Sequence, residues 1–565
     1  MDYKKYIAQK LSGFGVSEEE IESAIAVPPD RNMGDYALPC FKFAKTMRKA
    51  PVQIANDLCA SFVCDEVISK VEAVNGYLNF RVNREGLVKE SLAKILAEGD
   101  DYGKSDIGKD KTVCIDYSSI NIAKPFHIGH LSTTVIGGAL YRIFKFLGYN
   151  TVGINHLGDY GTQFGKLIYA YKKWGNKEAV EKGGIKELNR LYVLYHAESE
   201  KDSSMDDEAR NYFKLIEQGD KECNELFNWF KEITLKDVEK IYTELDVKFD
   251  SYAGESFYND KMQPVIDELS EKGLLKESEG AKIVDLEEYG MPPCLILRSD
   301  GASLYATRDL AAAFYRKNHY NFDKCLYVVA YQQNLHFKQI FKVLELMGKD
   351  WAKDMVHVAY GMVSLLDENG NQVAMSTRHG TVVLLEDVLK KCHEKCLEVI
   401  ESKNPDLEDK ENIAKQVGTG AVIFGALSNS KIKDVAFSYE KILNFDGETG
   451  PYVQYTAARI KSVLRKGGEP TDCEIANINE DEYQLISKLS EFPEIVKASA
   501  DKLEPFFVTR YAIEVASLFN KFYFNCKIIG EDKQVENFRL NVCKATLTVI
   551  NNSLGLLGIK VPERM

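Results

Sequence analysis

Short apolar runs alternate with longer stretches of helical periodicity through the middle of the chain. Thr112–Tyr117 is a run typical of a buried strand, and from Leu131 onward apolar residues recur on one face of a helix. The same order returns where Thr151–His156 is followed by Phe164–Trp174. Strands that alternate with helices in this way favour an α/β fold with a doubly wound, Rossmann-like parallel sheet.

Further elements of this sheet are predicted after a helix-rich stretch. A helical pattern and two buried strands follow, and a hairpin signal at Asp300-Gly301 precedes them. The predicted elements are strands at Leu295–Arg298 and Ser303–Ala306, a helix at Asp309–Lys317, and strands at Cys325–Tyr331 and Val356–Met362.

The two ends of the chain have different patterns. The first 105 residues mix helical runs with two strands joined at Asn75-Gly76, a strong hairpin signal, so an α+β domain is expected. After about residue 384 the pattern is helical to the end, which favours an α-helical bundle. The elements predicted here are helices at Ile21–Val27, Pro39–Met47, Phe506–Tyr523 and Val535–Leu557, and strands at Val67–Val74 and Gly76–Val82.

These patterns divide the 565 residues into four parts. The expected parts are an N-terminal domain at 1–105, a Rossmann-like domain at 106–385 with a helical insertion at about 176–290, a helical connector at 386–445, and a C-terminal helical domain at 446–565.

The composition indicates a soluble globular protein but does not indicate its function. Apolar residues make up 45% of the chain and charged residues 28%, which is ordinary for a soluble globular protein. No apolar run approaches the roughly 18–20 residues of a membrane span, and no secretory signal opens the chain, so a cytoplasmic protein is expected. The net charge of −13 weighs only weakly against nucleic acid as a partner, because local patches decide such binding.

The twelve cysteines are scattered, a usage that suits reduced thiols packed as small core residues. Cys392, His393 and Cys396 could be read as metal ligands, but no second pair accompanies them. We therefore expect no metal ligand from the protein.

Four polar segments carry the candidate chemistry. Several follow predicted strands, and the carboxyl ends of parallel strands converge on one crevice. The segments are Asp116–His130, Asn155–Gly165, Tyr305–Asp309 together with Gln333–His336, and Met375–Gly380.

The motif His127-Ile128-Gly129-His130 lies between a predicted strand and a helix start. Backbone N–H groups and the helix dipole make such a junction suitable for a phosphate. Two imidazoles add donors that can stabilise charge as it develops, and Gly129 leaves room for a flat base. This arrangement is typical of nucleotidyl transfer, although two surface histidines are the ordinary alternative.

In order and wording the four segments resemble a class I aminoacyl-tRNA synthetase, and specifically the arginyl-tRNA synthetase family. The resemblance spans nearly the whole chain. It includes Gly34-Asp35-Tyr36-Ala37, Gly254-Glu255-Ser256-Phe257-Tyr258, Gly450–Ile460 and Pro562-Glu563-Arg564-Met565.

Two departures from the family pattern stand out. The second class signature usually reads Lys-Met-Ser-Lys-Ser, but here it is Ala374-Met375-Ser376-Thr377-Arg378. In similar arginine enzymes a lysine ahead of the histidine motif supplies the missing charge, and Lys124 matches it. The other departure is Ile120, where the family usually has proline.

The resemblance implies ATP-dependent attachment of L-arginine to tRNA(Arg), through an arginyl-adenylate and release of pyrophosphate. A carboxylate is already ionised at pH 7, so positioning and charge neutralisation suffice and no protein nucleophile is needed. Mg²⁺ is expected on the ATP phosphates. Catalysis would fall to His127, His130, Lys124 and Arg378, and ATP would also contact Gly129, Met362, Val363, Met375 and Ser376.

The substrate's guanidinium is a permanent, forked cation, so its pocket should offer a carboxylate. Asp309 is the leading candidate, and Tyr305 one turn away can cover the aliphatic stem. By resemblance, Asp116 and Asn121 hold the amino and carboxylate groups. His156 and Gln333 complete the expected arginine site.

A C-terminal helix that interleaves aromatic and cationic residues suits stacking on anticodon bases. A helix that buries its tyrosines is the alternative interpretation. By resemblance, Met565 joins the anticodon pocket and two N-terminal residues contact the tRNA elbow. The expected tRNA contacts are Tyr77, Asn79, Tyr452, Tyr455, Arg459 and Met565.

Three other interpretations stay open at this point: a class I synthetase for another amino acid, a small-molecule nucleotidyltransferase, and a non-catalytic tRNA-binding paralogue. The second would not need the C-terminal helical domain, and the third should have lost the histidines or phosphate cations that this chain keeps. The expected working form is a monomer that does not act at a membrane.

Overall fold

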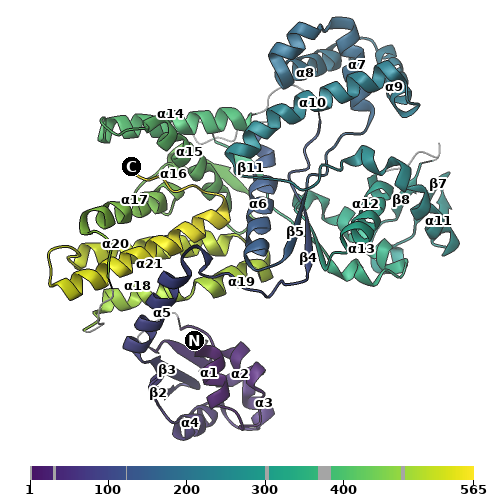
Figure 1. Ribbon diagram of the computed structural model, residues 1–565. Helices are drawn as coiled ribbons and strands as arrows, with labels where there is room; N and C mark the ends of the chain where they lie inside the picture. Colours follow the sequence, from purple (N-terminus) through teal and green to yellow (C-terminus); the bar gives the residue numbers. More distant parts are fainter. Residues whose placement is uncertain (1–2, 29–32, 123, 299–304, 367–382, 472–476) are drawn as a thin grey trace. The chain divides into compact units, whose positions relative to one another are not determined.

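The computed structural model describes residues 3–28, 33–122, 124–298, 305–366, 383–471 and 477–565 (Figure 1). These residues form two compact units, which are described separately. The first comprises Met1–Tyr102, Val463–Glu491 and Ser517–Val549, and the second Gly103–Ser462, Phe492–Ala516 and Ile550–Met565.

A four-stranded parallel sheet lies at the centre of the second unit. Its central strands are almost wholly buried, because side chains on both faces pack against helices. The predicted doubly wound sheet is thus confirmed. From one edge to the other the strands are β10 (Met355–His357), β9 (Lys324–Tyr327), β4 (Thr112–Asp116) and β5 (Asn150–Ile154).

Helices cover both faces of this sheet (Figure 1). α6 (Leu131–Phe146) lies on one side, whereas α12 (Tyr305–Tyr320) and α13 (Asn334–Leu346) lie on the other. The alanines Ala311–Ala313 of α12 are buried beside Cys325 and Tyr327 of β9, and these small residues let the helix approach the sheet closely. Because β4, β5 and β9 are parallel neighbours, their carboxyl ends lie at the same edge of the sheet.

A helical segment follows α7 (Thr162–Trp174), as the sequence predicted for the insertion. It then continues into an antiparallel three-stranded sheet, whose first two strands the helical prediction missed, whereas the third agrees with the strand predicted at Leu295–Arg298. The elements are α8 (Lys177–Ser199), α9 (Ser204–Glu217), α10 (Lys221–Glu244), α11 (Gln263–Glu271), β6 (Leu275–Ser278), β7 (Ala281–Val284) and β8 (Cys294–Leu297).

The predicted hairpin around Asp300-Gly301 is wrong in its second strand. β8 pairs with β7 instead, and Tyr305 and Ala306 begin helix α12. The run Ser303–Ala306 is too short for its periodicity to distinguish a strand from a helix start. Asp300-Gly301 itself lies outside the described residues.

After residue 384 the prediction of helix to the end has one exception among the strands of the described residues. The strand β12 (Val435–Phe437) pairs in parallel with β11 (Val363–Leu365). The remaining elements of this part are helical, namely α14 (Leu385–Lys403), α15 (Lys410–Leu427), α16 (Tyr439–Ile442), α17 (Gly450–Gly467), α18 (Glu480–Ser490), α19 (Phe492–Lys502), α20 (Phe506–Asn525) and α21 (Lys533–Leu557).

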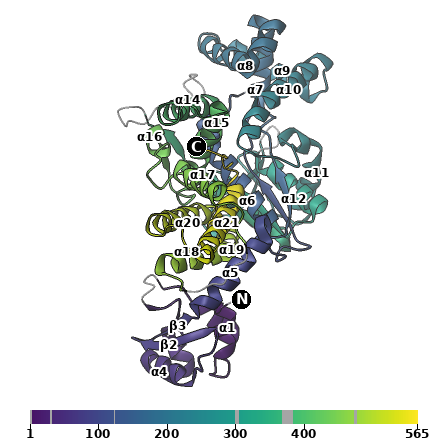
Figure 2. The same ribbon diagram turned by 60° about the vertical axis from the view of Figure 1, so that its left-hand side comes forward.

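The N-terminal part of the first unit is a small α+β fold, as predicted. Asn75 and Gly76 both have positive φ, so the hairpin turn matches the right-handed twist of its strands. Pro39–Met47 is not one helix, because the strand β1 ends at Pro39 and a 3₁₀ turn follows. The elements are α1 (Tyr3–Lys10), α2 (Glu18–Ala24), β1 (Tyr36–Pro39), α3 (Ala44–Met47), α4 (Pro51–Ser61), β2 (Ile68–Val74), β3 (Tyr77–Val82) and α5 (Arg84–Glu98), also visible in Figure 2.

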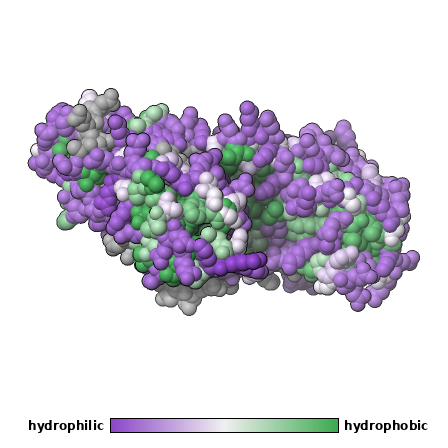
Figure 3. Space-filling view, turned by 90° about the horizontal axis from the view of Figure 1, so that it is seen from below, coloured by the Kyte–Doolittle hydropathy of each residue, from purple (hydrophilic) through white to green (hydrophobic). Residues whose placement is uncertain are grey.

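Polar residues cover most of the face drawn in Figure 3, with apolar residues in patches between them. Among the described residues, no helix combines the length and apolar character that crossing a membrane requires.

Candidate active site

A strained turn links the end of β4 to the histidine motif. Ser118 and Ser119 have φ values of 68° and 44°, which side chains with a Cβ rarely adopt. One hydroxyl of the turn and one of helix α6 hold it: Ser119 Oγ donates to Asp116 Oδ1 at 2.7 Å, and Ser118 N donates to Thr133 Oγ1 at 3.0 Å. Strain of this kind persists only where surrounding bonds enforce it.

The first two predicted segments lie side by side. Ile122 N donates to Gly158 O at 3.1 Å, and Gly158 N donates to Ile120 O at 2.8 Å. A Cβ at Gly158 would lie 2.4 Å from Asn121 Oδ1, so any larger residue there would displace the Asn121 side chain. Ile120 replaces the family's usual proline and here supplies a carbonyl to the pairing. Asn121 is exposed beside this loop.

The two histidines of the motif are oriented by backbone donors. Gly129 N donates to His127 Nδ1 at 3.1 Å, and His127 N donates to His130 Nδ1 at 3.2 Å. Because each Nδ1 accepts a hydrogen bond, the neutral rings carry their proton on Nε2. The ring centroids are 3.9 Å apart, so the motif presents two neighbouring N–H donors.

Both imidazoles are neutral at physiological pH. Burial, with the nearby charge of Lys124, lowers the pKa of His127 to about 4. Burial, His127 and Lys124 together lower the pKa of His130 to about 3. The positive charge beside the motif therefore belongs to Lys124, whose Nζ lies 5.9 Å from the ring centroid of Tyr192 in α8.

The segment after the second signature contacts the histidine motif directly. Ile128 N donates to Val383 O at 2.9 Å, and Leu385 N donates to Phe126 O at 3.0 Å. Of the residues predicted to lie near the nucleotide, Val363 begins β11 and Met362 directly precedes it, with Met362 exposed. The predicted Met375, Ser376 and Arg378 lie outside the described residues.

Asp309, the predicted partner of the guanidinium, lies near His156, another residue of the predicted arginine site. Its Oδ1 lies 3.9 Å from His156 Nε2, and its Oδ2 lies 2.6 Å from His336 Nε2. Burial acts to raise the pKa of Asp309, but the hydrogen bond with His336 and the charges of His336, His156 and Arg316 lower it. The carboxylate is therefore ionised and oriented. Tyr305, one turn earlier on α12, and Gln333 are both exposed.

Asp116, predicted to hold the substrate, already has an internal partner. Arg316 Nη2 donates to Asp116 Oδ2 at 2.6 Å, and the two side chains are only 1% and 7% exposed. Arg316 Nη2 also lies 3.4 Å from His156 Nδ1. One side of this carboxylate is thus occupied by a guanidinium of the protein itself.

A further carboxyl, Glu255, lies in the same neighbourhood and was quoted in the sequence only as part of a family phrase. Burial raises its pKa to about 7; Arg308 opposes this shift, whereas Asp309 and Asp159 reinforce it. Its backbone N–H donates to Leu157 O at 2.9 Å, which fixes it beside the second segment. The sequence could have suggested Glu255 as a site residue only because it is a carboxylate directly after Gly254. The sequence could not show that this carboxylate is partly buried.

Asp159 and Arg308 support this corner of the site from behind. Asp159 is fully buried and accepts from Lys231 Nζ at 2.6 Å and from Ser256 N at 2.9 Å. Arg308 is 4% exposed and lies 4.3 Å from the ring centroid of Tyr160. These contacts connect the second segment, the Gly254–Tyr258 phrase and α12.

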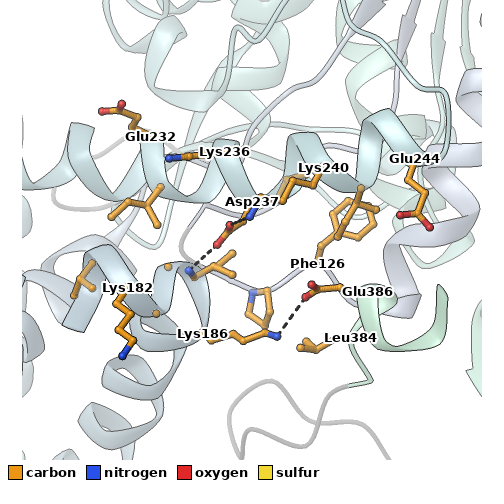
Figure 4. A pocket seen from close by; sticks show the side chains of 18 of the residues that line it. Phe126, Lys182, Lys186, Glu232, Lys236, Asp237, Lys240, Glu244, Leu384 and Glu386 are labelled. Carbon is orange, nitrogen blue, oxygen red and sulfur yellow. Dashed lines mark hydrogen bonds and ion pairs between the residues drawn. The ribbon is translucent and has the colours of Figure 1, made fainter. Parts of the chain in front are cut away.

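A cavity of about 800 Å³ lies between helices α8 and α10 and the start of α14 (Figure 4). Lys186 Nζ lies 3.3 Å from Glu386, and Asp237 accepts from Ile185 N at 2.9 Å and from Lys240 Nζ at 2.8 Å. Two lysines of the cavity lining therefore pair with carboxylates that also line the cavity. The lining is of mixed charge and not purely cationic.

The Cys392–Cys396 stretch is built into helix α14. Both thiols are buried and free, and burial raises the pKa of each to about 12. His393 Nε2 lies 3.1 Å from Glu244 of α10 and 3.0 Å from Thr419 of α15. The three residues therefore serve helix packing in this structure.

The predicted tRNA contacts differ in accessibility. On α17, Tyr455 is 40% exposed and Arg459 lies over its ring at 4.9 Å. Tyr452 is half-buried, and Met565 packs against the cluster that contains Cys396. In the first unit Tyr77 is 44% exposed, but Asn79 is only 6% exposed, so its side chain offers little surface to a partner.

The C-terminal tail is attached to the same helix. Gln454 Nε2 donates to Lys560 O at 2.7 Å, and Lys461 Nζ lies 2.9 Å from Glu563. These contacts place the last residues along α17, beside the exposed aromatic and cationic pair.

A parallel sheet with a histidine motif after β4 and a group of carboxylates near its strand ends, Asp116, Asp309 and Glu255, fits a class I aminoacyl-tRNA synthetase. The family model described as "tRNA synthetases class I (R), catalytic domain" matches residues 91–439. The models "Arginyl tRNA synthetase N terminal domain" and "DALR anticodon binding domain" match residues 1–82 and 453–565.

Relatives of full length agree with these matches. The chain is 52% identical to the arginine–tRNA ligase of Clostridium beijerinckii over 100% of both chains, and 54% identical to that of Clostridioides difficile over 97% of both. The solved structure of Thermus thermophilus arginyl-tRNA synthetase superposes with a TM-score of 0.85 at 25% identity, covering 100% of this chain and 99% of that one. The chain belongs to the arginyl-tRNA synthetase family.

Proposed function

We propose how the described residues share the work of an arginine–tRNA ligase. The enzyme charges tRNA(Arg) with arginine and uses ATP to do so. In the first step an arginine carboxylate oxygen attacks the α-phosphate and pyrophosphate leaves. In the second, a hydroxyl of the terminal adenosine attacks the arginyl carbonyl and AMP leaves.

The observation that carries this proposal is the state of Asp309. It is an ionised carboxylate, oriented by His336 at 2.6 Å, at the edge of a crevice that also holds Glu255 and His156. The forked substrate guanidinium suits two carboxylates, and Tyr305 can cover the aliphatic stem. An amino acid without a guanidinium would leave these carboxylates unpaired, which makes its binding unfavourable. Sites of this polar kind can select their substrate by about 10⁴–10⁵-fold without an editing step.

We assign the amino and carboxylate groups of the substrate to residues near the end of β4. Asp116 retains accepting capacity beyond its two internal bonds, because a carboxylate offers about four lone-pair sites. We assign it the substrate ammonium, with exposed Asn121 nearby for the carboxylate and Gln333 for the guanidinium edge.

On the nucleotide side, neutral His127 and His130 donate through Nε2–H to the phosphates as charge develops. Lys124 supplies the full positive charge, and Arg378 adds to it. Gly129, Met362, Val363, Met375 and Ser376 complete the ATP site. In this proposal Lys124 and Arg378 supply the positive charge that the lysines of the second signature provide in other class I enzymes.

Mg²⁺ would enter on the ATP phosphates, the usual arrangement for this ion. The donor set around the histidine motif fits that arrangement, because imidazoles and an ammonium approach phosphate oxygens and leave the metal to the nucleotide. In the described residues no group of three or more metal-binding side chains is found. Bound there, Mg²⁺ would neutralise phosphate charge.

For tRNA we assign the anticodon to Tyr452, Tyr455, Arg459 and Met565, supported by the exposed Tyr455–Arg459 pair. Tyr77 and Asn79 remain the elbow candidates, with Tyr77 the more accessible. The working form we propose is a cytoplasmic monomer, which sedimentation of the purified chain would test.

The direct test charges a tRNA pool with each of the twenty amino acids separately. Arginine should be attached to the acceptor end and the other nineteen should not. An Asp309→Asn variant, which keeps the shape but removes the charge, is the matched control for the arginine site. Attachment of a different amino acid by the unaltered chain would refute the proposal.

A further inference from the structure

Arg316 is a buried cation directly behind the proposed arginine site. Its side chain is 1% exposed, and its Nε and Nη1 have no hydrogen-bond partner among the described residues. Its guanidinium carbon lies 5.1 Å from the ring centroid of Tyr327 in β9. A largely buried guanidinium with so few bonds is costly, so a specific use for its charge is expected.

Arg316 and Asp309 lie two turns apart on one face of α12. Their partners differ, because Asp309 contacts His336 whereas Arg316 reaches across to Asp116 at the end of β4. His156 lies between the two pairs, 3.4 Å from Arg316 Nη2 and 3.9 Å from Asp309 Oδ1. The helix thus holds one acid and one cation at opposite ends of the same crevice.

Without Arg316, Asp116 would be a second carboxylate without a cationic partner from the arginines of the protein, beside a substrate that carries two cationic groups. Such a substrate has two cationic ends, a guanidinium and an ammonium, and either could pair with either carboxylate. The ion pair reduces the negative charge of Asp116, and Ser119 Oγ holds its other oxygen at 2.7 Å. The full charge of Asp309 then remains for the stronger, forked cation.

We propose that Arg316 is a positioning residue that determines the direction in which arginine binds. By occupying Asp116 Oδ2 it directs the substrate guanidinium to Asp309 and leaves Asp116 to the ammonium. The carboxylate of the substrate then points to the histidine motif, which follows Asp116 through the Ser118–Ser119 turn. The inference rests on the proposed arginine site.

The test compares Arg316→Met and Arg316→Lys with Asp116→Asn and with the double variant Asp116→Asn/Arg316→Met. Arg316→Met should lower kcat for arginine activation about tenfold or more without raising the KM for arginine, because arginine bound in the reverse direction does not react. The KM for ATP should stay within about twofold, since Arg316 acts on the amino-acid side. Arg316→Lys keeps the charge and should recover part of the loss.

The double variant decides whether Arg316 acts through Asp116. If it does, the double variant should have the kcat of Asp116→Asn alone, whereas independent effects on kcat would multiply. It also removes both buried charges, so it should fold even if Arg316→Met leaves Asp116 unpaired and unstable. Thermal unfolding of every variant accompanies the kinetics.

Arg142→Met is the matched control for loss of a buried arginine. Arg142 in α6 donates from Nε to Leu556 O at 3.0 Å and from Nη1 to Asp246 O at 2.7 Å, away from the arginine site. It should leave kcat for arginine activation unchanged. Multiplicative effects on kcat in the double variant, or a kcat for Arg316→Met equal to that of Arg142→Met, would overturn the inference. Failure of the unaltered enzyme to charge arginine would instead refute the site itself.

Discussion

His336 Nε2 lies 2.6 Å from Asp309 Oδ2, so the carboxylate that we assign to the substrate guanidinium is held by an imidazole from the next helix. His336 is on α13 and Asp309 on α12, and the contact spans 27 positions of the chain. With Oδ2 engaged, Oδ1 is the oxygen that remains for the guanidinium.

This contact predicts that substitution of Asp309 impairs the use of arginine more than substitution of His336 does. Asp309→Asn should lower kcat/KM for arginine by about 10²-fold or more, because an amide cannot pair with the cation. His336→Ala should raise the arginine KM by about tenfold or less, because the carboxylate is retained but loses its orientation. Steady-state pyrophosphate exchange in the presence of tRNA measures both. An unchanged arginine KM in Asp309→Asn would remove this residue from the site.

Glu255 predicts proton release when arginine binds. Its pKa of about 7 means that about half of the carboxyls are protonated at pH 7, and a bound guanidinium would lower that pKa. Calorimetry at pH 7 in buffers of different ionisation enthalpy should show release of about half a proton per arginine. Arginine affinity should accordingly rise from pH 6 to pH 8. Glu255→Gln is the control and should abolish both effects; equal release by this variant would assign the proton elsewhere.

The histidine motif should not titrate near neutrality. The pKa values of His127 and His130 are lowered to about 4 and about 3, so both rings should stay neutral, with the proton on Nε2, down to about pH 5. Nitrogen NMR of the imidazoles reports this directly, with His127→Asn to assign the signals. Protonation of either ring near pH 6.5 would contradict the structure.

The same shift has a consequence for stability. In the unfolded chain these histidines take up protons near their ordinary pKa of 6.5, whereas the folded protein resists until about pH 4. The unfolded state therefore binds more protons in this window, and the free energy of unfolding should fall as the pH drops through it. Denaturant titrations of the unaltered chain and of His127→Asn at pH 7 and pH 5 would measure the difference.

Lys124 should act on the rate of activation more than on arginine binding. Lys124→Ala should lower kcat by about 10²–10³-fold, because it removes a charge that neutralises the phosphates in the transition state. Lys124→Arg keeps the charge and should retain more activity. Lys186→Ala, a surface lysine paired with Glu386, is the control. A near-normal kcat in Lys124→Ala would end the idea that it compensates for the altered second signature.

Asp35 and Tyr483 predict a stability effect in the first unit. Tyr483 donates to Asp35 Oδ1 at 2.7 Å, and Val82 N donates to Oδ2 at 2.9 Å, in a site where Asp35 is 8% exposed. Tyr483→Phe should lower the free energy of unfolding by about 1–3 kcal/mol, because a buried acceptor loses its donor. Tyr77→Phe, on an exposed tyrosine, should change it by less than about 0.5 kcal/mol. Equal effects would show that the buried bond contributes nothing.

The strands and helices of the catalytic sheet were predictable because their signal is local. Thr112–Tyr117 and the stripe from Leu131 carry the periodicity of a buried strand and a one-sided helix, and β4 and α6 occupy those positions. The Asn75-Gly76 turn was equally readable, since few residues tolerate two successive positive φ values. Short elements were harder to predict: Tyr305 and Ala306 were assigned to a strand but begin a helix, and β12 was missed within a helical region.

The sequence by itself determined which residue types carry the chemistry, in which order, and that they follow strands of one parallel sheet. Only the tertiary structure decided their partners and charges. Asp116 meets Arg316 across 200 positions, Asp309 meets His336 on a neighbouring helix, and Glu255 is buried beside two other acids. Hydrogen bonding and protonation depend on distance and burial in space, which crossover connections set and which no local pattern of residues encodes.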